Sequence, residues 1–168
     1  MFVFSCYTGL AYIDTMRLTP SNIIRGIDGE YWLITNRKKT ETAVKVPLLP
    51  KALEIISKYK EHPRASVHHT LFPNISNQKL NSYLKEIADL CGIDKHLTFH
   101  LARHTFATTV TLSNGVPIES VSKMLGHTKI TTTQIYAKVI ERKLSDDMKA
   151  LRDKLGAAQN KRVTVLAK

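Results

Sequence analysis

The sequence predicts a mainly α-helical α+β domain with a small antiparallel β-sheet near its N-terminal edge. Across residues 77–91, apolar side chains recur every three or four positions, which is the spacing of an amphipathic helix. Residues 31–35 and 43–46 are instead rich in aromatic and β-branched residues, as short strands are. Helical patterns dominate after residue 47, so we expect one domain in which helices pack against a small sheet.

The N-terminal part of the chain is expected to contain two short helices and the sheet. Residues 2–7 are apolar, and residues 11–18 are a short helical candidate with one apolar face. Residues 23–24 are a candidate third strand, which a turn at Asp28-Gly29 joins to the next one. Pro47 ends the sheet because proline lacks the N–H that a strand ladder needs.

Two helices and a loop follow the sheet. Pro50 suits the first turn of a helix, and residues 64–75 are expected to form a loop. Ser76 or Asn77 caps the strongly periodic helix, and Gly92 ends it.

The last part of the chain is predicted to be helical throughout. Residues 99–112 and 117–125 form two helices, each followed by a glycine. Residues 130–139 have weaker helical propensity because threonine and other β-branched residues are frequent there. Residues 140–155 form a final helix with an apolar stripe. The members of this stripe are Leu144, Met148, Leu151 and Leu155.

The charge balance favours a polyanionic partner. The 168 residues include 25 Lys and Arg against 14 Asp and Glu, a formal net charge of +11. Nucleic acid is the first candidate for such a partner and an acidic membrane surface the second.

Cys6 and Cys91 lie in apolar contexts without metal-binding spacing, so we expect reduced core cysteines of an intracellular protein. No apolar run approaches the ~18 residues of a membrane span.

Four residues could together hold and attack a phosphate, and a fifth, Lys39, lies on a hairpin tip that could reach a DNA groove. His100 and Arg103 are three positions apart on one helix face, where a guanidinium grips two phosphate oxygens and an imidazole adds a hydrogen bond. His127 follows a helix end, Tyr136 comes nine positions later, and Lys39 lies in a basic run between two strands. Each also has a structural alternative. Arg103 could pair with an acid, His100 or His127 could cap a helix, Tyr136 could be a core ring, and Lys39 could be a solvated hairpin tip.

The order of these residues resembles the catalytic domain of the tyrosine recombinases, the phage and transposon integrases. The matching stretches are C-Y-T-G-L at 6–10, R-K-K-T at 37–40, T-F-H-L-A-R-H-T-F-A-T at 98–108 and M-L-G-H-T-K-I-T-T-T-Q-I-Y at 124–136. They span nearly all of the chain, and the last two are the specific ones.

The resemblance implies a site-specific recombinase that works without metal or cofactor. Tyr136 would attack a DNA phosphate, form a 3′-phosphotyrosyl link and release a 5′-hydroxyl. Arg103 would neutralise charge on the nonbridging oxygens and His127 would hydrogen-bond one of them. His100 would take the Tyr136 proton or contact the phosphate, and Lys39 would be the general acid for the leaving oxygen.

The chain departs from the family at one position. The family places a phosphate-clamping arginine after T-G-L, where this sequence has Ala11. Some integrases of mobile elements resemble this chain in lacking that arginine, so another cation is expected to serve. Arg17 is the first candidate, and Arg37 and Lys38 are others. The alternatives are a DNA-binding module that cleaves poorly and a decayed remnant. A third rival is a type IB topoisomerase or telomere resolvase.

The resemblance also implies an architecture and partners. Residues 1–168 are expected to be a single catalytic domain, truncated at its N-terminal edge and without the core-DNA-binding domain that family members carry. Double-stranded DNA is the expected partner, with a monomer alone and a tetramer on DNA. The apolar stripe of the last helix would pack on a neighbouring protomer or within its own domain. The expected location is the bacterial cytoplasm, at the nucleoid.

Overall fold

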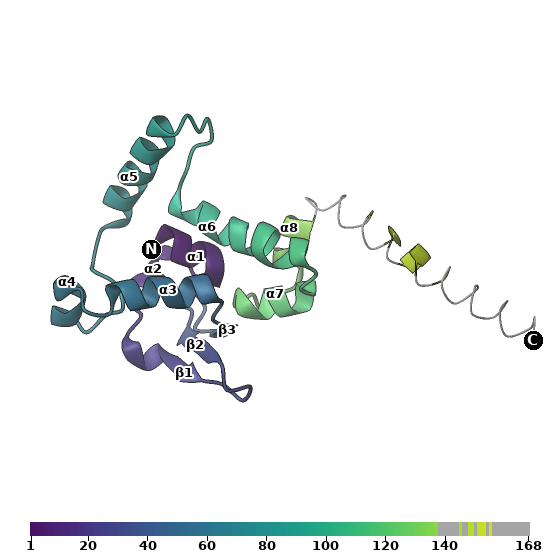
Figure 1. Cartoon of the computed structure of the whole chain (residues 1–168), viewed down its shortest axis with the longest axis horizontal. Helices are drawn as coiled ribbons and strands as arrows, with labels where there is room; N and C mark the ends of the chain where they lie inside the picture. Colours follow the sequence, from purple (N-terminus) through teal and green to yellow (C-terminus); the bar gives the residue numbers. More distant parts are fainter. Residues whose placement is uncertain (138–144, 146–147, 150, 154, 156–168) are drawn as a thin grey trace, which may run out of the picture. The chain divides into compact units, whose positions relative to one another are not determined.

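The chain divides into two compact units, residues 1–137 and residues 138–168. The computed structural model describes residues 1–137 and, in the second unit, residues 145, 148–149, 151–153 and 155. Of the predicted apolar stripe, Leu144 lies outside the described residues, while Met148, Leu151 and Leu155 are helical and exposed. The fold described below is that of the first unit (Figure 1).

This unit is a mainly helical α+β domain, as predicted. Its N-terminal elements are α1 (Phe2–Thr8), α2 (Tyr12–Met16), the 3-10 turn η1 (Pro20–Asn22), β1 (Ile23–Arg25), β2 (Tyr31–Asn36) and β3 (Ala43–Pro47). The helices that follow are α3 (Pro50–Tyr59), α4 (Pro63–Val67), α5 (Asn77–Leu90), α6 (Phe99–Thr105), the π-helical η2 (Phe106–Thr111), the 3-10 turn η3 (Leu112–Asn114), α7 (Ile118–Met124) and α8 (Thr131–Ala137). No helix among the described residues is long and apolar enough to cross a membrane.

The sheet is antiparallel with strand order β1-β2-β3, and the candidate third strand is confirmed. Leu33 pairs with Val46 across β2 and β3, and both side chains are buried on the face that packs against the helices. Along β3 buried and exposed residues alternate, which is the pattern of a sheet with one solvated face. The turn between β2 and β3 carries Lys39 away from this core.

Helix α1 lies at the centre of the unit, flanked by α3 and α6 (Figure 1). Its end is fixed by Gly9, which has a φ of 72°. A Cβ atom there would lie 2.5 Å from Cδ1 of Phe106, so only glycine lets the end of α1 approach η2 this closely. This approach brings the carbonyl of Gly9 to the buried side chain of Arg103.

Two expectations were wrong, those for residues 64–75 and for Cys91, and the predicted helix over 99–112 is helical but not α-helical throughout. The predicted loop over 64–75 contains α4, because Pro63 starts a helical turn at its first position. The predicted helix over 99–112 widens into a π-helical segment, in which the Thr111 hydroxyl donates to the carbonyls of both Phe106 and Ala107. Cys91 is exposed rather than a core residue, because α5 ends just before it.

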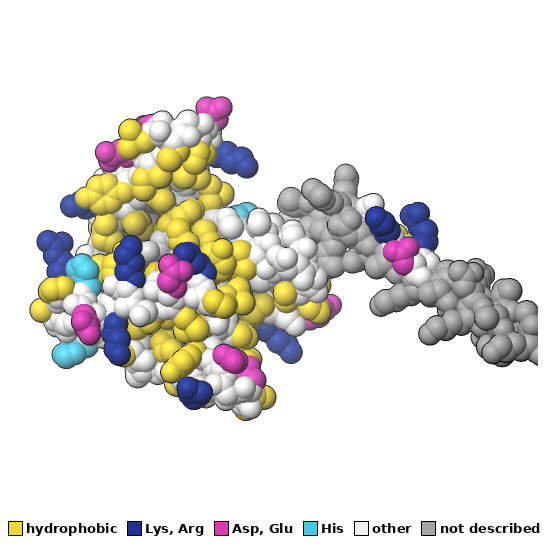
Figure 2. Space-filling view, in the orientation of Figure 1, with side chains coloured by type: hydrophobic (Ala, Val, Ile, Leu, Met, Phe, Trp, Pro, Cys, Tyr) yellow, Lys and Arg dark blue, Asp and Glu magenta, His cyan; other side chains and the backbone are white. Residues whose placement is uncertain are grey.

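Helix α5 buries only part of its predicted apolar face. Leu80 and Leu84 contribute to a core cluster with Phe99, whereas Tyr83 and Ile87 are exposed. Figure 2 shows apolar side chains gathered over α5 and between it and the helices beside it.

Candidate active site

Arg103 is the buried centre of the site. It projects from α6 and is only 4% exposed. Its guanidinium donates to the carbonyl oxygens of Gly9 and Leu125, at the ends of α1 and α7, and its Nη2 lies 3.1 Å from Nε2 of His127. Burial first, and then the charge of Arg37, lower the pKa of Arg103 to about 10. The guanidinium therefore stays charged at neutral pH in a place where its charge is poorly solvated.

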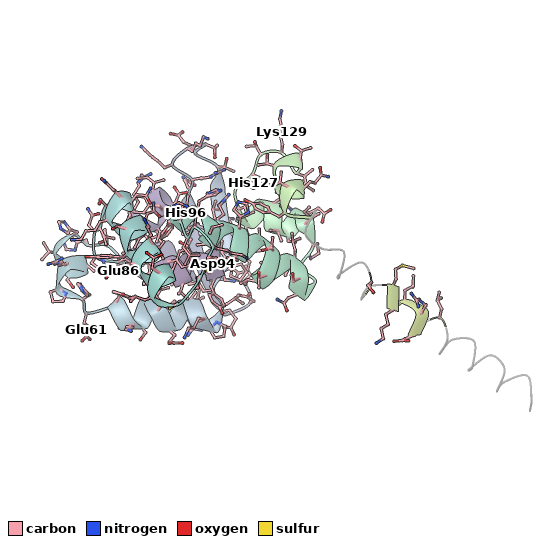
Figure 3. All side chains as sticks on the ribbon, turned by 90° about the horizontal axis from the view of Figure 1, so that it is seen from above. Glu61, Glu86, Asp94, His96, His127 and Lys129 are labelled. Carbon is pink, nitrogen blue, oxygen red and sulfur yellow. The ribbon has the colours of Figure 1, made fainter. Side chains whose placement is uncertain are left out.

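His127 lies beside Arg103 because α7 ends at a close approach to the sheet. Gly126 has a φ of 62°, and a Cβ atom there would lie 2.7 Å from Cγ2 of Val44. The backbone N–H of His127 caps α7 by donating to the carbonyl of Ser122, and the ring is left to face Arg103. Figure 3 shows His127 and Lys129 on the segment that joins α7 to α8.

The tautomer of His127 follows from its two partners. Arg103 can only donate, so Nε2 of His127 accepts, and the ring proton sits on Nδ1. Nδ1 then donates to Oγ1 of Thr133, which is fully buried and 2.8 Å away. Burial and the charges of Arg103 and Arg37, in that order, lower the pKa of His127 to about 4, so the ring is neutral at pH 7.

Tyr136 enters the same site from α8. It is 4% exposed, and its ring stacks parallel to that of His127 with centroids 6.5 Å apart. The phenol raises the pKa of Arg103, which places it within electrostatic reach of the guanidinium. The structure therefore brings together Arg103, His127 and Tyr136, three of the five residues that the sequence singled out.

The other two predicted residues lie at the edge of this cluster. His100 is exposed and lines a hollow of about 210 Å³ that it shares with Arg103 and Ala11. Lys39 is exposed on the turn between β2 and β3, and none of the described residues contacts its ammonium group through a hydrogen bond or ion pair. Lys39 is thus on a hairpin tip, as predicted, and its catalytic role stays a prediction.

The base of this hairpin is tied to α2 by Asp14, which the sequence did not single out as a site residue. The Asp14 carboxylate is buried and its Oδ1 accepts from the backbone N–H of Lys38 at 2.8 Å. Its charge also raises the pKa of Arg103. The only signal in the sequence was an acid one turn after Ala11.

The candidate replacements for the missing arginine occupy different places. Arg17 is exposed and lines a hollow of about 640 Å³ with Arg37, Lys38 and Asp14. Arg37 is half-buried, and its Nη1 lies 3.4 Å from the carbonyl oxygen of Gly126. Its charge lowers the pKa of both Arg103 and His127. Arg37 therefore acts on the cluster directly.

Comparison with known proteins is consistent with this geometry. The sequence model described as Phage integrase family matches residues 1–143. The chain is 36% identical over 112 residues to tyrosine recombinase XerD of Listeria monocytogenes serotype 4b (strain F2365), covering 60% of this chain and 37% of that protein. It is 31% identical over 136 residues to XerD of Corynebacterium glutamicum, covering 78% of this chain and 42% of that protein. The chain thus spans about two fifths of the length of these relatives.

Solved structures share the fold. The crystal structure of XerA recombinase matches with a TM-score of 0.70 and 25% identity, over 88% of this chain and 55% of XerA. The catalytic domain of bacteriophage HP1 integrase matches with a TM-score of 0.59 and 22% identity, over 88% of this chain and 79% of the HP1 domain. The chain therefore belongs to the phage integrase family and has the fold of a tyrosine recombinase catalytic domain.

Proposed function

We propose that this chain is the catalytic domain of a site-specific DNA recombinase that breaks and rejoins DNA through a 3′-phosphotyrosyl intermediate. The observation that carries the proposal is the meeting of Arg103, His127 and Tyr136, which lie on α6, on the segment between α7 and α8, and on α8. Double-stranded DNA as substrate is supported by the net charge of +11. The structures of two similar proteins also support a DNA substrate: XerH bound to its difH substrate, and the Tn1549 integrase in complex with DNA.

In the proposed reaction the Tyr136 oxygen bonds to phosphorus as the bond from phosphorus to the 5′-oxygen breaks. Arg103 neutralises charge that develops on the nonbridging oxygens. His127 donates to one of them in the other tautomer, with its proton on Nε2 and with Nδ1 accepting from the Thr133 hydroxyl. The leaving 5′-oxygen takes a proton from Lys39. Because the phosphotyrosyl link keeps the energy of the phosphodiester, a 5′-hydroxyl reverses the reaction without ATP.

Two roles remain proposed for His100, taking the Tyr136 proton or contacting the phosphate. Its place in the hollow beside Arg103 supports the phosphate contact. The ring of His104 contacts both His100 and Tyr136. The proton that Tyr136 loses as it bonds to phosphorus therefore passes through a water molecule, either to His100 or to solvent.

We further propose that Arg37 supplies the second positive charge of the phosphate clamp. The charge of Arg37 lowers the pKa of both Arg103 and His127, and its Nη1 lies 3.4 Å from the carbonyl oxygen of Gly126, the neighbour of His127. Arg17 is exposed. An anion held by Arg103 and His127 would therefore lie within the field of Arg37. Arg17, expected from the sequence as the replacement, stays a candidate for this role, because the hollow that it lines also contains Arg37.

A suicide substrate with a nick near the crossover tests the proposal. The nicked strand loses a short fragment on cleavage, so the covalent protein–DNA adduct accumulates. We expect the adduct with the wild-type chain and with Tyr83→Phe, a change at an exposed tyrosine of α5, and none with Tyr136→Phe. Salt-sensitive binding without any adduct would favour a DNA-binding module or remnant instead. Supercoil relaxation without recombination would favour a topoisomerase.

Assembly and location are proposed on the same basis. A monomer alone that becomes a tetramer on DNA would appear in sedimentation velocity as a DNA-dependent change in mass. A monomer on DNA at saturating protein would contradict this proposal. The cytoplasmic, nucleoid-associated location stays an expectation.

A further inference from the structure

His104 is a second imidazole beside Tyr136 that the proposed reaction does not use. It follows Arg103 directly on α6 and lies one turn beyond His100. Its ring meets the ring of His100 with centroids 5.1 Å apart at 79°, and the ring of Tyr136 with centroids 4.9 Å apart at 80°. Both contacts have the edge-to-face geometry that aromatic pairs prefer. The half-buried His104 ring therefore contacts both the exposed His100 and the buried Tyr136.

Tyr136 is consequently bounded by two imidazoles in different orientations. His104 meets it edge to face, and His127 lies parallel to it. Helix α8, which carries Tyr136, has seven residues and begins with three threonines, so its own stability is too low to aim the side chain. The two ring contacts supply the orientation that the helix alone does not.

The position of His104 is itself well fixed. The hydroxyl of Thr108 donates to the carbonyl of His104 at 2.8 Å, where α6 passes into the π-helical segment. The neighbouring Arg103 holds α6 through its bonds to the carbonyls of Gly9 and Leu125. Within residues 1–137 the His104 ring makes no side-chain hydrogen bond, so its contacts are those of an aromatic surface.

The charges around His104 favour a neutral ring. Burial, then His100 and then Arg103 lower the pKa of His104. A protonated His104 would add a cation beside the guanidinium of Arg103. The ring is therefore suited to packing against Tyr136 rather than to carrying charge.

We infer that His104 is a positioning residue for Tyr136, whose ring it holds in the pose that faces the phosphate site of Arg103 and His127. The inference rests on the proposed function for its catalytic consequence, but the ring contact itself does not. A misplacement of about 1 Å in a reacting group costs roughly 100-fold in rate. Loss of the His104 ring is therefore expected to slow cleavage by roughly 10- to 100-fold.

Three variants separate ring packing from other roles in single-turnover cleavage. His104→Ala removes the ring, His104→Phe keeps an aromatic ring without nitrogens, and His96→Ala is a control at an exposed histidine before α6. We expect the DNA concentration at half-saturation to stay within about 2-fold for all three. The cleavage rate should fall roughly 10- to 100-fold in His104→Ala, stay within about 3-fold in His104→Phe, and not change in His96→Ala. Equal losses in His104→Ala and His104→Phe would overturn the inference, because an imidazole nitrogen would then be needed.

A readout without DNA tests the contact independently. In the full chain with ring-¹³C-labelled tyrosine, Tyr136→Phe assigns the Tyr136 resonance. That resonance should shift in His104→Ala, shift less in His104→Phe and stay in place in His96→Ala. An unshifted Tyr136 resonance in His104→Ala would overturn the inference whatever the cleavage rates. A wild-type chain that forms no adduct would refute the proposed function, while the resonance would still decide whether His104 orients Tyr136.

Discussion

Replacing Arg37 by alanine removes the cation that acts on both Arg103 and His127. An arginine that stabilises the transition state of phosphoryl transfer is worth roughly 10³–10⁵ in rate, or about 4–7 kcal/mol at ~1.36 kcal/mol per decade. Arg37 is only half-buried and would share the phosphate with Arg103, so the lower end applies. We expect Arg37→Ala to slow cleavage by roughly 10³-fold.

Stability should respond differently from cleavage. Without DNA, Arg37 lies near another buried cation, and its one hydrogen bond, to the carbonyl of Gly126, is long at 3.4 Å. Removing Arg37 therefore trades a weak bond for relief of like-charge repulsion. The free energy of unfolding should change by less than about 1 kcal/mol, a typical net value for one hydrogen bond.

The assay is the rate of adduct formation on the nicked substrate at saturating protein, with unfolding by urea measured in parallel. Arg17→Ala is the matched control, since it removes an arginine from the same hollow as Arg37. Ala11→Arg in the Arg37→Ala background should restore part of the rate, because Ala11 lines the hollow beside His100 and Arg103. A larger loss in Arg17→Ala than in Arg37→Ala would refute the reasoning and assign the role to Arg17.

Three further predictions concern the packing around Gly9, the acid role of Lys39 and the pH dependence of stability. Gly9→Ala should lower the free energy of unfolding in urea by about 1–3 kcal/mol, because its Cβ atom would lie 2.5 Å from Phe106. The control is Gly92→Ala, which has a φ of 63° and open space around it and should cost about 1 kcal/mol. The Lys39→Ala variant should cleave an ordinary phosphodiester slowly. It should cleave a substrate with sulfur at the 5′-bridging position at the normal rate, because a thiolate leaves without taking up a proton. An equal defect on both substrates would rule out the acid role. The folded pKa of His127 lies at about 4, below its ordinary value of 6.5. The unfolded chain therefore binds this proton first, and stability is lost as pH falls from 6.5 towards 4. His127→Gln should abolish that part of the loss, on the order of 1 kcal/mol after allowance for solvent screening, in unfolding measured across pH.

The elements of the fold were predictable where the sequence carries a local signal. The helix α5 follows from side-chain spacing, the strands β2 and β3 follow from their aromatic and β-branched residues, and glycines mark the ends of α1 and α7. Arg103, His127 and Tyr136 were predictable because each lies in a specific stretch of the family pattern. The structure adds that the three come together.

Contacts between segments that are distant in the sequence could not be predicted from it. Asp14 and Lys38 are 24 positions apart, and nothing in their local context says that a carboxylate anchors the hairpin base. The influence of Arg37 on His127 depends on how closely Gly126 approaches the sheet. The contact of His104 with Tyr136 likewise depends on the packing of α8 against the segment that follows α6.

The surroundings of Arg103 support the proposed phosphate-binding role over the structural alternative that its sequence context also allowed. A structural arginine would pair with an acid, yet the one ion pair formed within residues 1–137 joins Lys51 and Glu54, on the exposed face of α3. Arg103 instead donates to backbone carbonyls and a neutral imidazole, and the more distant charge of Asp14 offsets only part of the effect of its burial. The fall of its pKa from 12.5 to about 10 corresponds to about 3 kcal/mol of unfavourable free energy in the folded state at neutral pH, at ~1.36 kcal/mol per unit. An anion in the site would offset this penalty. The buried and only partly balanced charge of Arg103 therefore supports the proposal that a phosphate binds there.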